Sequence, residues 1–206
     1  MLQNLLAMFV TFFLVVDPLG IIPLYLSLTS GFSKEKKVQI IKRALITALT
    51  VFAVFILFGR AILRFLGIET GAFFIAGGIL LFFVSMDMLF AAPKRTKTSP
   101  MEQDSEDISI FPLGIPILAG PGTITTILLY VGNEEADLAT HLTVAGVLIF
   151  VLLLAGVFLR LSEYFVRLLT TTGLSVIERI MGLILSGLSV QFVYDGLLRL
   201  QILQLK

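Results

Sequence analysis

The sequence predicts an all-α polytopic membrane protein: six transmembrane helices arranged as two inverted three-helix repeats, with helices one and four broken. The composition indicates a lipid environment. Of the 206 residues 57% are hydrophobic and 14% are charged, and the mean hydropathy is +1.02, far from the average of soluble proteins. The long apolar runs predict the helices, and the likeness of the two halves predicts the repeat. The chain has no cysteine and one histidine, which excludes disulfides and thiolate or multi-histidine metal sites.

Six apolar runs are close to the roughly 20 residues that cross about 30 Å of hydrocarbon. They are apolar on all sides rather than alternating with period two, which favours helices over the strands of a membrane barrel. The first run lacks a basic segment before it and a small-residue cleavage site, so we expect a retained span. The six runs cover approximately residues 3–29, 41–66, 69–90, 111–131, 140–161 and 178–200.

The first run is interrupted at Asp17-Pro18-Leu19-Gly20. Aspartate is a good helix N-cap because its carboxylate accepts a hydrogen bond from a free amide, and proline is favoured next because its missing amide costs nothing there. Gly20 lets another backbone come close, and Pro23 removes one more hydrogen bond of the helix. We therefore expect Asp17 to cap a half-helix that starts at Pro18, near the middle of the membrane.

The fourth run is interrupted at Ala119-Gly120-Pro121-Gly122-Thr123. Pro121 can begin a half-helix after the flexible Ala119-Gly120, and Pro112 and Pro116 weaken the helix before it. Broken helices in lipid leave backbone groups without partners, which is tolerated only where those groups face protein or a polar cavity. A matched pair of breaks in the two halves therefore points to a central transport site.

A segment with linker character divides the chain into a first repeat (residues 1–91), a cytoplasmic linker (92–110) and a second repeat (111–206). The halves match at offsets of 102 to 104 positions, pairing Pro18 with Pro121, Thr70 with Thr172 and Gly78 with Gly182. Three spans per half is an odd number, so the second half must enter the membrane from the opposite side, as an inverted repeat. The alternative is chance recurrence of residues common in membrane helices.

Orientation follows from the basic residues near the span ends, because short basic loops stay in the cytoplasm. With the N-terminus outside, 11 Lys and Arg residues lie on the cytoplasmic side and 4 on the other. We therefore expect a multi-pass protein of the plasma (inner) membrane with both termini outside.

Two half-helix N-termini that meet at mid-membrane present free amides and about half a positive charge each, which suits an anion. Asp17 would partly offset that potential. A zwitterion fits both features, with its carboxylate on the amides near Gly120 to Thr123 and its ammonium near Asp17. The glycines leave little room for a large side chain, so we expect a small amino acid.

Eleven residues are candidates for solute binding: Asp17, Pro18, Gly20, Gly77, Gly78, Gly120, Pro121, Gly122, Thr123, Thr126 and Gln191. Asp17 is also the candidate ion-coupling residue, since intramembrane carboxylates are by default functional; the alternative is a structural cap. Gly77 and Gly78 suit close helix packing before solute lining, and Gln191 suits a hydrogen bond either to solute or to a neighbouring helix. Asp87 and Asp195 lie near predicted span ends, where we expect them to face water.

Four motifs in order make the chain resemble the MarC family from Leu5 to about Leu197. They are residues 17–23 (DPLGIIP), 75–81 (IAGGILL), 118–126 (LAGPGTITT) and 179–183 (RIMGL). The resemblance implies a six-helix inner-membrane protein distantly related to amino-acid exporters, with alanine and glycine as solutes of some members. It also implies Asp or Asn at the site of Asp17 and Ala or Thr at that of Thr123. Drug efflux is not expected from it.

We therefore expect a secondary transporter of small neutral amino acids, because the chain has no P-loop to power a primary pump. The coupling ion is H⁺ carried by Asp17, or Na⁺ held by unwound carbonyls. We expect no enzyme: Tyr194-Asp195 resembles half of an aspartyl protease site, but Gly-x-Gly-Asp and His-Glu-x-x-His are absent. A channel, a non-transporting membrane protein and an exporter of other small solutes stay open. The expected partners are the solute and lipid, without cofactor, metal or nucleic acid, and a homo-oligomer stays open.

Overall fold

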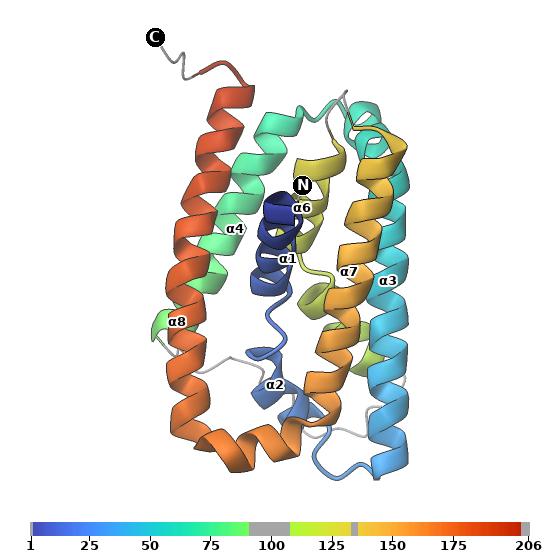
Figure 1. The fold of residues 1–206 in the computed structure, drawn as a ribbon, viewed down its shortest axis with the longest axis vertical. Coiled ribbons are helices and arrows are strands. Elements are labelled where there is room, and N and C mark those ends of the chain that lie inside the picture. Colours follow the sequence, from blue (N-terminus) through green and yellow to red (C-terminus); the bar gives the residue numbers. More distant parts are fainter. Residues whose placement is uncertain (1, 91–107, 133–135, 203–206) are drawn as a thin grey trace.

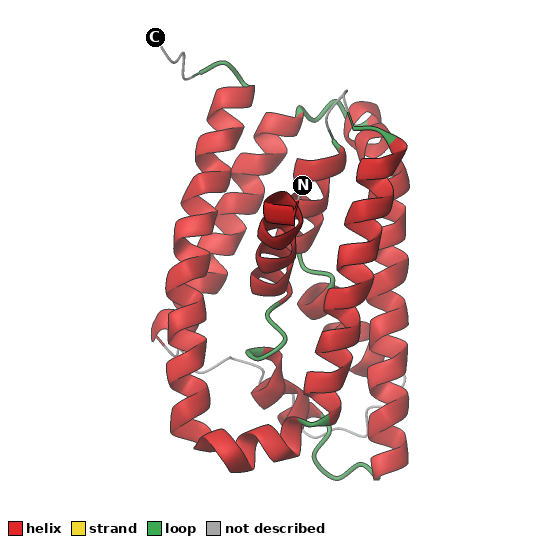
Figure 2. Ribbon diagram, viewed as in Figure 1, coloured by secondary structure: helices red, strands yellow, loops and turns green. Residues whose placement is uncertain are grey.

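The computed structural model describes residues 2–90, 108–132 and 136–202, and within them every regular element is helical (Figures 1 and 2). The prediction of an all-α membrane protein is confirmed. In chain order the elements are α1 (Leu2–Val16), α2 (Ile21–Leu28), α3 (Lys34–Phe65), α4 (Thr70–Phe90), η1 (Ser109–Leu118), α6 (Pro121–Val131), α7 (Leu138–Arg160) and α8 (Ser162–Arg199).

The described chain has five single segments that are long and apolar enough to cross a membrane, and six if the bent pair η1 and α6 is counted as one span. The five are Asn4–Leu28, Lys34–Phe65, Thr70–Phe90, Leu138–Arg160 and Ser175–Arg199. The sixth is the pair η1 and α6, which bends by 51° at its break. The breaks fall in the first and fourth spans, as predicted. The predicted linker lies outside the described residues except for its last three, 108–110.

Equivalent helices of the two halves pack against each other. α4 runs along α8, and α3 runs along α7, each pair in opposite directions (Figure 1). Of the broken elements, α1, α2 and α6 lie between these pairs (Figure 1), and η1 packs against α3. This pairing is consistent with the inverted repeat, which stays a prediction.

The buried apolar residues form two clusters. The larger one joins α1, α2, α3, η1, α6 and α7 around fully buried aromatic rings such as Phe12 and Phe52. The smaller one joins α4 and α8 through Leu81, Met88 and Phe192. The α4–α8 pair therefore has an apolar cluster of its own, against which Val15 of α1 and Leu129 of α6 also pack.

Glycines allow the α4 and α8 backbones to approach closely. A Cβ atom at Gly78 would lie 2.7 Å from the Ser189 carbonyl oxygen, and one at Gly196 would lie 2.7 Å from the Gly71 carbonyl oxygen. Close approach through small residues is the usual way in which helices associate in lipid, where no hydrophobic force drives them together.

The substitution Gly78→Ala is therefore expected to destabilise the protein by about 1–3 kcal/mol, because its methyl group meets backbone atoms that cannot move aside. Thermal unfolding of the purified protein in detergent measures the effect. Gly187→Ala on α8 is the matched control, since a Cβ atom there meets nothing within 4 Å. Equal stability of the two variants would contradict this packing.

The first part of α8 crosses one end of the bundle before the helix bends at Thr170 (φ 56°, ψ 169°) and enters its span (Figure 1). The sequence predicted the sixth span but not this preceding segment, whose Tyr164 and Leu168 are exposed beside Arg167, as in helices that lie in a membrane interface. We call this end, which carries the α3 start and residues 160–170, the basic end.

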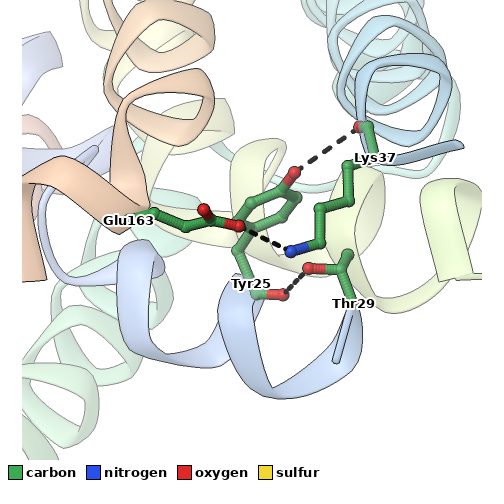
Figure 3. Close-up of polar contacts among 4 residues, drawn as sticks. All are labelled: Tyr25, Thr29, Lys37 and Glu163. Atoms are coloured by element: carbon green, nitrogen blue, oxygen red, sulfur yellow. Dashed lines mark hydrogen bonds and ion pairs between the residues drawn. The ribbon is translucent and has the colours of Figure 1, made fainter. Parts of the chain in front are cut away.

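Three elements are tied together at the basic end (Figure 3). Lys37 Nζ of α3 donates to Glu163 Oε1 of α8 at 2.8 Å, and the Tyr25 hydroxyl of α2 donates to the Lys37 carbonyl oxygen at 3.5 Å. The hydrogen bond from Lys37 holds the pKa of the Glu163 carboxyl below its ordinary value. Thr29 closes the end of α2 by donating to the Tyr25 carbonyl oxygen at 2.7 Å.

Candidate functional site

The break in the first span is a turn built around Asp17. Asp17 has a left-handed backbone (φ 48°), and its Oδ1 atom accepts a hydrogen bond from the Gly20 amide at 3.1 Å. A Cβ atom at Gly20 would clash with the Asp17 carboxylate, so the turn needs glycine there. The carboxylate thus holds the turn that leads into α2.

The predicted start of the half-helix at Pro18 is wrong by three residues. Gly20 is the N-cap and α2 begins at Ile21. Asp17 has a left-handed backbone, a conformation that aspartate tolerates better than most residues, and residues 18–20 continue as a turn before α2 begins. Aspartate can cap a helix directly or bond the amides of a preceding turn, and here it does the latter.

The break in the fourth span starts a half-helix where the sequence predicted it. Gly120 is an extended N-cap (φ −77°, ψ 164°) and Pro121 is the first residue of α6. No side chain caps this helix, and the amides of a first helical turn have no partner within the helix. Before the break, Phe111 and Ile115 are extended because each precedes a proline.

A cavity of about 470 Å³ joins the two breaks to α4. Six of the predicted binding residues line it: Asp17, Gly20, Gly120, Pro121, Gly122 and Thr123. The opposite wall is one face of α4, formed by Leu80, Leu81, Val84, Asp87 and Met88. Segments about 100 residues apart in the chain therefore meet at one hollow, as expected from the paired breaks.

Five of the predicted binding residues lie outside the lining of this cavity. Pro18 is buried within its turn, and Thr126 Oγ1 donates to the Gly122 carbonyl oxygen at 2.9 Å. Gly77 packs against Thr125 of α6, and Gly78 packs against α8, which is the packing role that the sequence favoured for them.

Gln191 is the fifth of these residues. It is exposed on α8, where its Nε2 atom donates to Asp195 Oδ1 at 2.7 Å. This bond lies within a single helix, one turn apart, rather than between neighbouring helices. The structure therefore does not bring Gln191 to the cavity.

The hydroxyl of Thr123 is a buried polar group in the cavity wall. The Thr123 side chain is 1% exposed, and its hydroxyl has no hydrogen-bond partner in the described part of the chain. The neighbouring Thr125 and Thr126 hydroxyls instead donate to carbonyl oxygens of α6 at 2.8 and 2.9 Å. An unsatisfied buried hydroxyl costs about 1–3 kcal/mol, so a partner supplied by a solute would be favourable.

Asp87 is the cavity residue that sequence reasoning missed. The sequence predicted that it faces water near a span end, and its exposed side chain lines the cavity three residues before the end of α4. The signal in the sequence was that Asp87 follows Leu80 and Val84 at helical spacing, which places the three on one face of the helix. The cavity thus offers uncapped amides and a hydroxyl that suit a carboxylate, and two carboxylates that suit a cation.

A model of MarC family integral membrane proteins matches residues 2–201. The UPF0056 membrane protein MJ0972 of Methanocaldococcus jannaschii is 38% identical over 196 residues, covering 93% of this chain and 86% of the relative. The UPF0056 membrane protein YvbG of Bacillus subtilis is 32% identical over 202 residues, covering 96% and 95% of the two chains. No solved structure matches.

Proposed function

The chain belongs to the MarC family of integral membrane proteins, and from this premise we propose that it is a secondary transporter of small neutral amino acids, of the size of alanine and glycine. The observation that carries the proposal is the cavity in which both helix breaks meet. Paired half-helices at a central cavity are the usual binding site of secondary transporters built from inverted repeats.

The chemistry of the cavity supports a zwitterion. The solute's carboxylate is proposed to bind the N-terminus of α6, where it accepts hydrogen bonds from the Gly122 and Thr123 amides and from the Thr123 hydroxyl. Its ammonium group is proposed to face the carboxylates of Asp17 and Asp87, which line the same cavity. A cavity of about 470 Å³ is ample for such a molecule together with water.

The separate apolar cluster of the α4–α8 pair supports a mechanism for moving the solute. The cavity lies between the α4 wall and the breaks, which belong to separate apolar clusters. Rocking of the α4–α8 pair against the rest would open the cavity to one side and then to the other, as in alternating access. Asp17 is proposed to carry the coupling proton, because its carboxylate is part of the turn that shapes the cavity.

Uptake of labelled alanine and glycine into proteoliposomes tests the proposal. We expect saturable uptake, accelerated by an imposed pH gradient, and exchange of internal for external amino acid. If a sodium gradient drives uptake and a pH gradient does not, the coupling ion is Na⁺ rather than H⁺. Unsaturable flux would instead show a channel, and no uptake under any gradient would contradict transport of amino acids.

Orientation in the membrane has its own test. We propose that the basic end is cytoplasmic, since it carries Lys34, Lys36 and Arg167 and short basic segments stay inside. Because the chain has no cysteine, Glu69→Cys in the turn between α3 and α4, and Lys36→Cys at the start of α3, each carry a unique thiol. A membrane-impermeant thiol reagent added to intact cells is expected to label Glu69→Cys but not Lys36→Cys. Labelling of Lys36→Cys but not of Glu69→Cys would show the opposite topology.

A further inference from the structure

We infer that Asp87 selects solutes by charge: its carboxylate, in the cavity wall toward the basic end, admits cationic and zwitterionic molecules and rejects anionic ones. The inference rests on the proposed function for its meaning in transport. The effect of the Asp87 charge on molecules that enter the cavity does not depend on transport, and the labelling test below measures it directly.

The position of Asp87 places it between the α6 N-terminus and the end of α4. Leu81 contacts the α6 N-terminus, since a Cβ atom at Gly122 would clash with its side chain. Asp87 is six residues further along α4 on the same wall, which is a rise of about 9 Å. α4 runs toward the basic end (Figure 1), so a solute that enters from that end passes Asp87 before it reaches Thr123.

Helix stability does not explain an acidic residue at this position. Asp87 lies in the last turn of α4, where the helix dipole disfavours negative charge, and this last turn contains no basic residue. No Lys, Arg or His from the described residues lines the cavity. The Asp87 carboxylate is therefore not neutralised by a basic side chain of the cavity wall.

The two carboxylates of the cavity, those of Asp17 and Asp87, differ in their local structure. The Asp17 carboxylate accepts the Gly20 amide and shapes the turn. The Asp87 side chain is exposed and projects from a regular stretch of α4. The unpartnered, buried Thr123 hydroxyl, together with the uncapped α6 N-terminus, marks the place for the solute's own carboxylate. A second carboxylate on a solute would then extend toward Asp87 and be repelled.

Charge-selective labelling of a cavity cysteine tests the inference. Val84→Cys provides a unique thiol in the wall, one helical turn from Asp87. Its rates of reaction with a cationic and an anionic methanethiosulfonate of similar size are divided by the rates with a free thiol. We expect the cation-to-anion ratio to fall about tenfold when Asp87→Asn is added, as for a unit charge that attracts one reagent and repels the other across about 7 Å at a dielectric close to that of water. Glu69→Gln, an exposed carboxylate at the other end of α4, is the matched control and should leave the ratio unchanged.

An unchanged ratio in Asp87→Asn, or a thiol at Val84→Cys that reacts with neither reagent, would overturn the inference. Competition against labelled alanine uptake provides the second measurement. Free aspartate is expected to compete about tenfold more weakly than serine in the wild type, and Asp87→Asn should bring the two close together. Absence of uptake in the wild type would contradict the proposed function alone, because the labelling ratio does not depend on transport.

Discussion

Asp17→Asn is expected to abolish pH-driven uptake of alanine and glycine while the protein stays folded and inserted. The asparagine side-chain oxygen can still accept the Gly20 amide, as Asp17 Oδ1 does at 3.1 Å, and asparagine tolerates the left-handed backbone at this position. The turn is therefore kept, and only the charge and the titratable proton are lost. Uptake into proteoliposomes, with thermal unfolding in detergent as the check of folding, measures both effects.

Asp17→Ala provides the comparison for Asp17→Asn. Alanine removes the acceptor for Gly20 as well as the charge, and it disfavours a positive φ, so this variant is expected to lose stability in addition to uptake. Uptake by Asp17→Asn at the wild-type rate and with the same pH dependence would show that Asp17 only caps the turn. The coupling proton would then have to be carried elsewhere.

Thr123→Val is expected to raise thermal stability and at the same time to weaken solute binding. Valine has nearly the same shape as threonine, and the hydroxyl that it removes is buried without a partner among the described residues. Removing such a group relieves a cost of about 1–3 kcal/mol. Loss of a hydrogen bond to the solute's carboxylate is expected to raise the apparent Kd roughly ten- to a hundredfold.

Thr126→Val is the matched control on the same helix. Its hydroxyl donates to the Gly122 carbonyl oxygen at 2.9 Å, so valine there is expected to lower stability by about 0.5–1.5 kcal/mol and to leave solute affinity unchanged. Opposite signs of the two stability effects would support the roles given to these hydroxyls. A Thr123→Val protein that is less stable and binds alanine as well as the wild type would contradict them.

Local signals were sufficient to predict the spans and their breaks. Long apolar runs marked the helices, and Pro121 after Ala119-Gly120 marked the start of α6 at the residue where the structure begins it. The start of α2 was missed by three residues because Asp17 has two ways to bond free amides, and the choice between them depends on Gly20 leaving space for the carboxylate.

The lining of the cavity could be predicted only where the breaks supply it. In a membrane helix the faces toward lipid, toward other helices and toward a cavity are all apolar, so no periodicity separates them. On α4 the contact with α8 uses Gly71 and Gly78, and this turns Leu80, Val84 and Asp87 toward the breaks. The same uncertainty of face made Gln191 a candidate, although the structure places it on an exposed side of α8.

Protection of a cavity cysteine by solute tests the central claim most directly, which is that a small zwitterion binds between the two breaks. Val84→Cys lines that cavity in a chain without other cysteines, and Lys36→Cys is the exposed control outside it. Alanine is expected to slow alkylation of Val84→Cys in a saturable manner, with no effect on Lys36→Cys, and in Thr123→Val the same protection should need roughly ten- to a hundredfold more alanine. Alkylation of Val84→Cys at the same rate with and without saturating alanine would contradict the account.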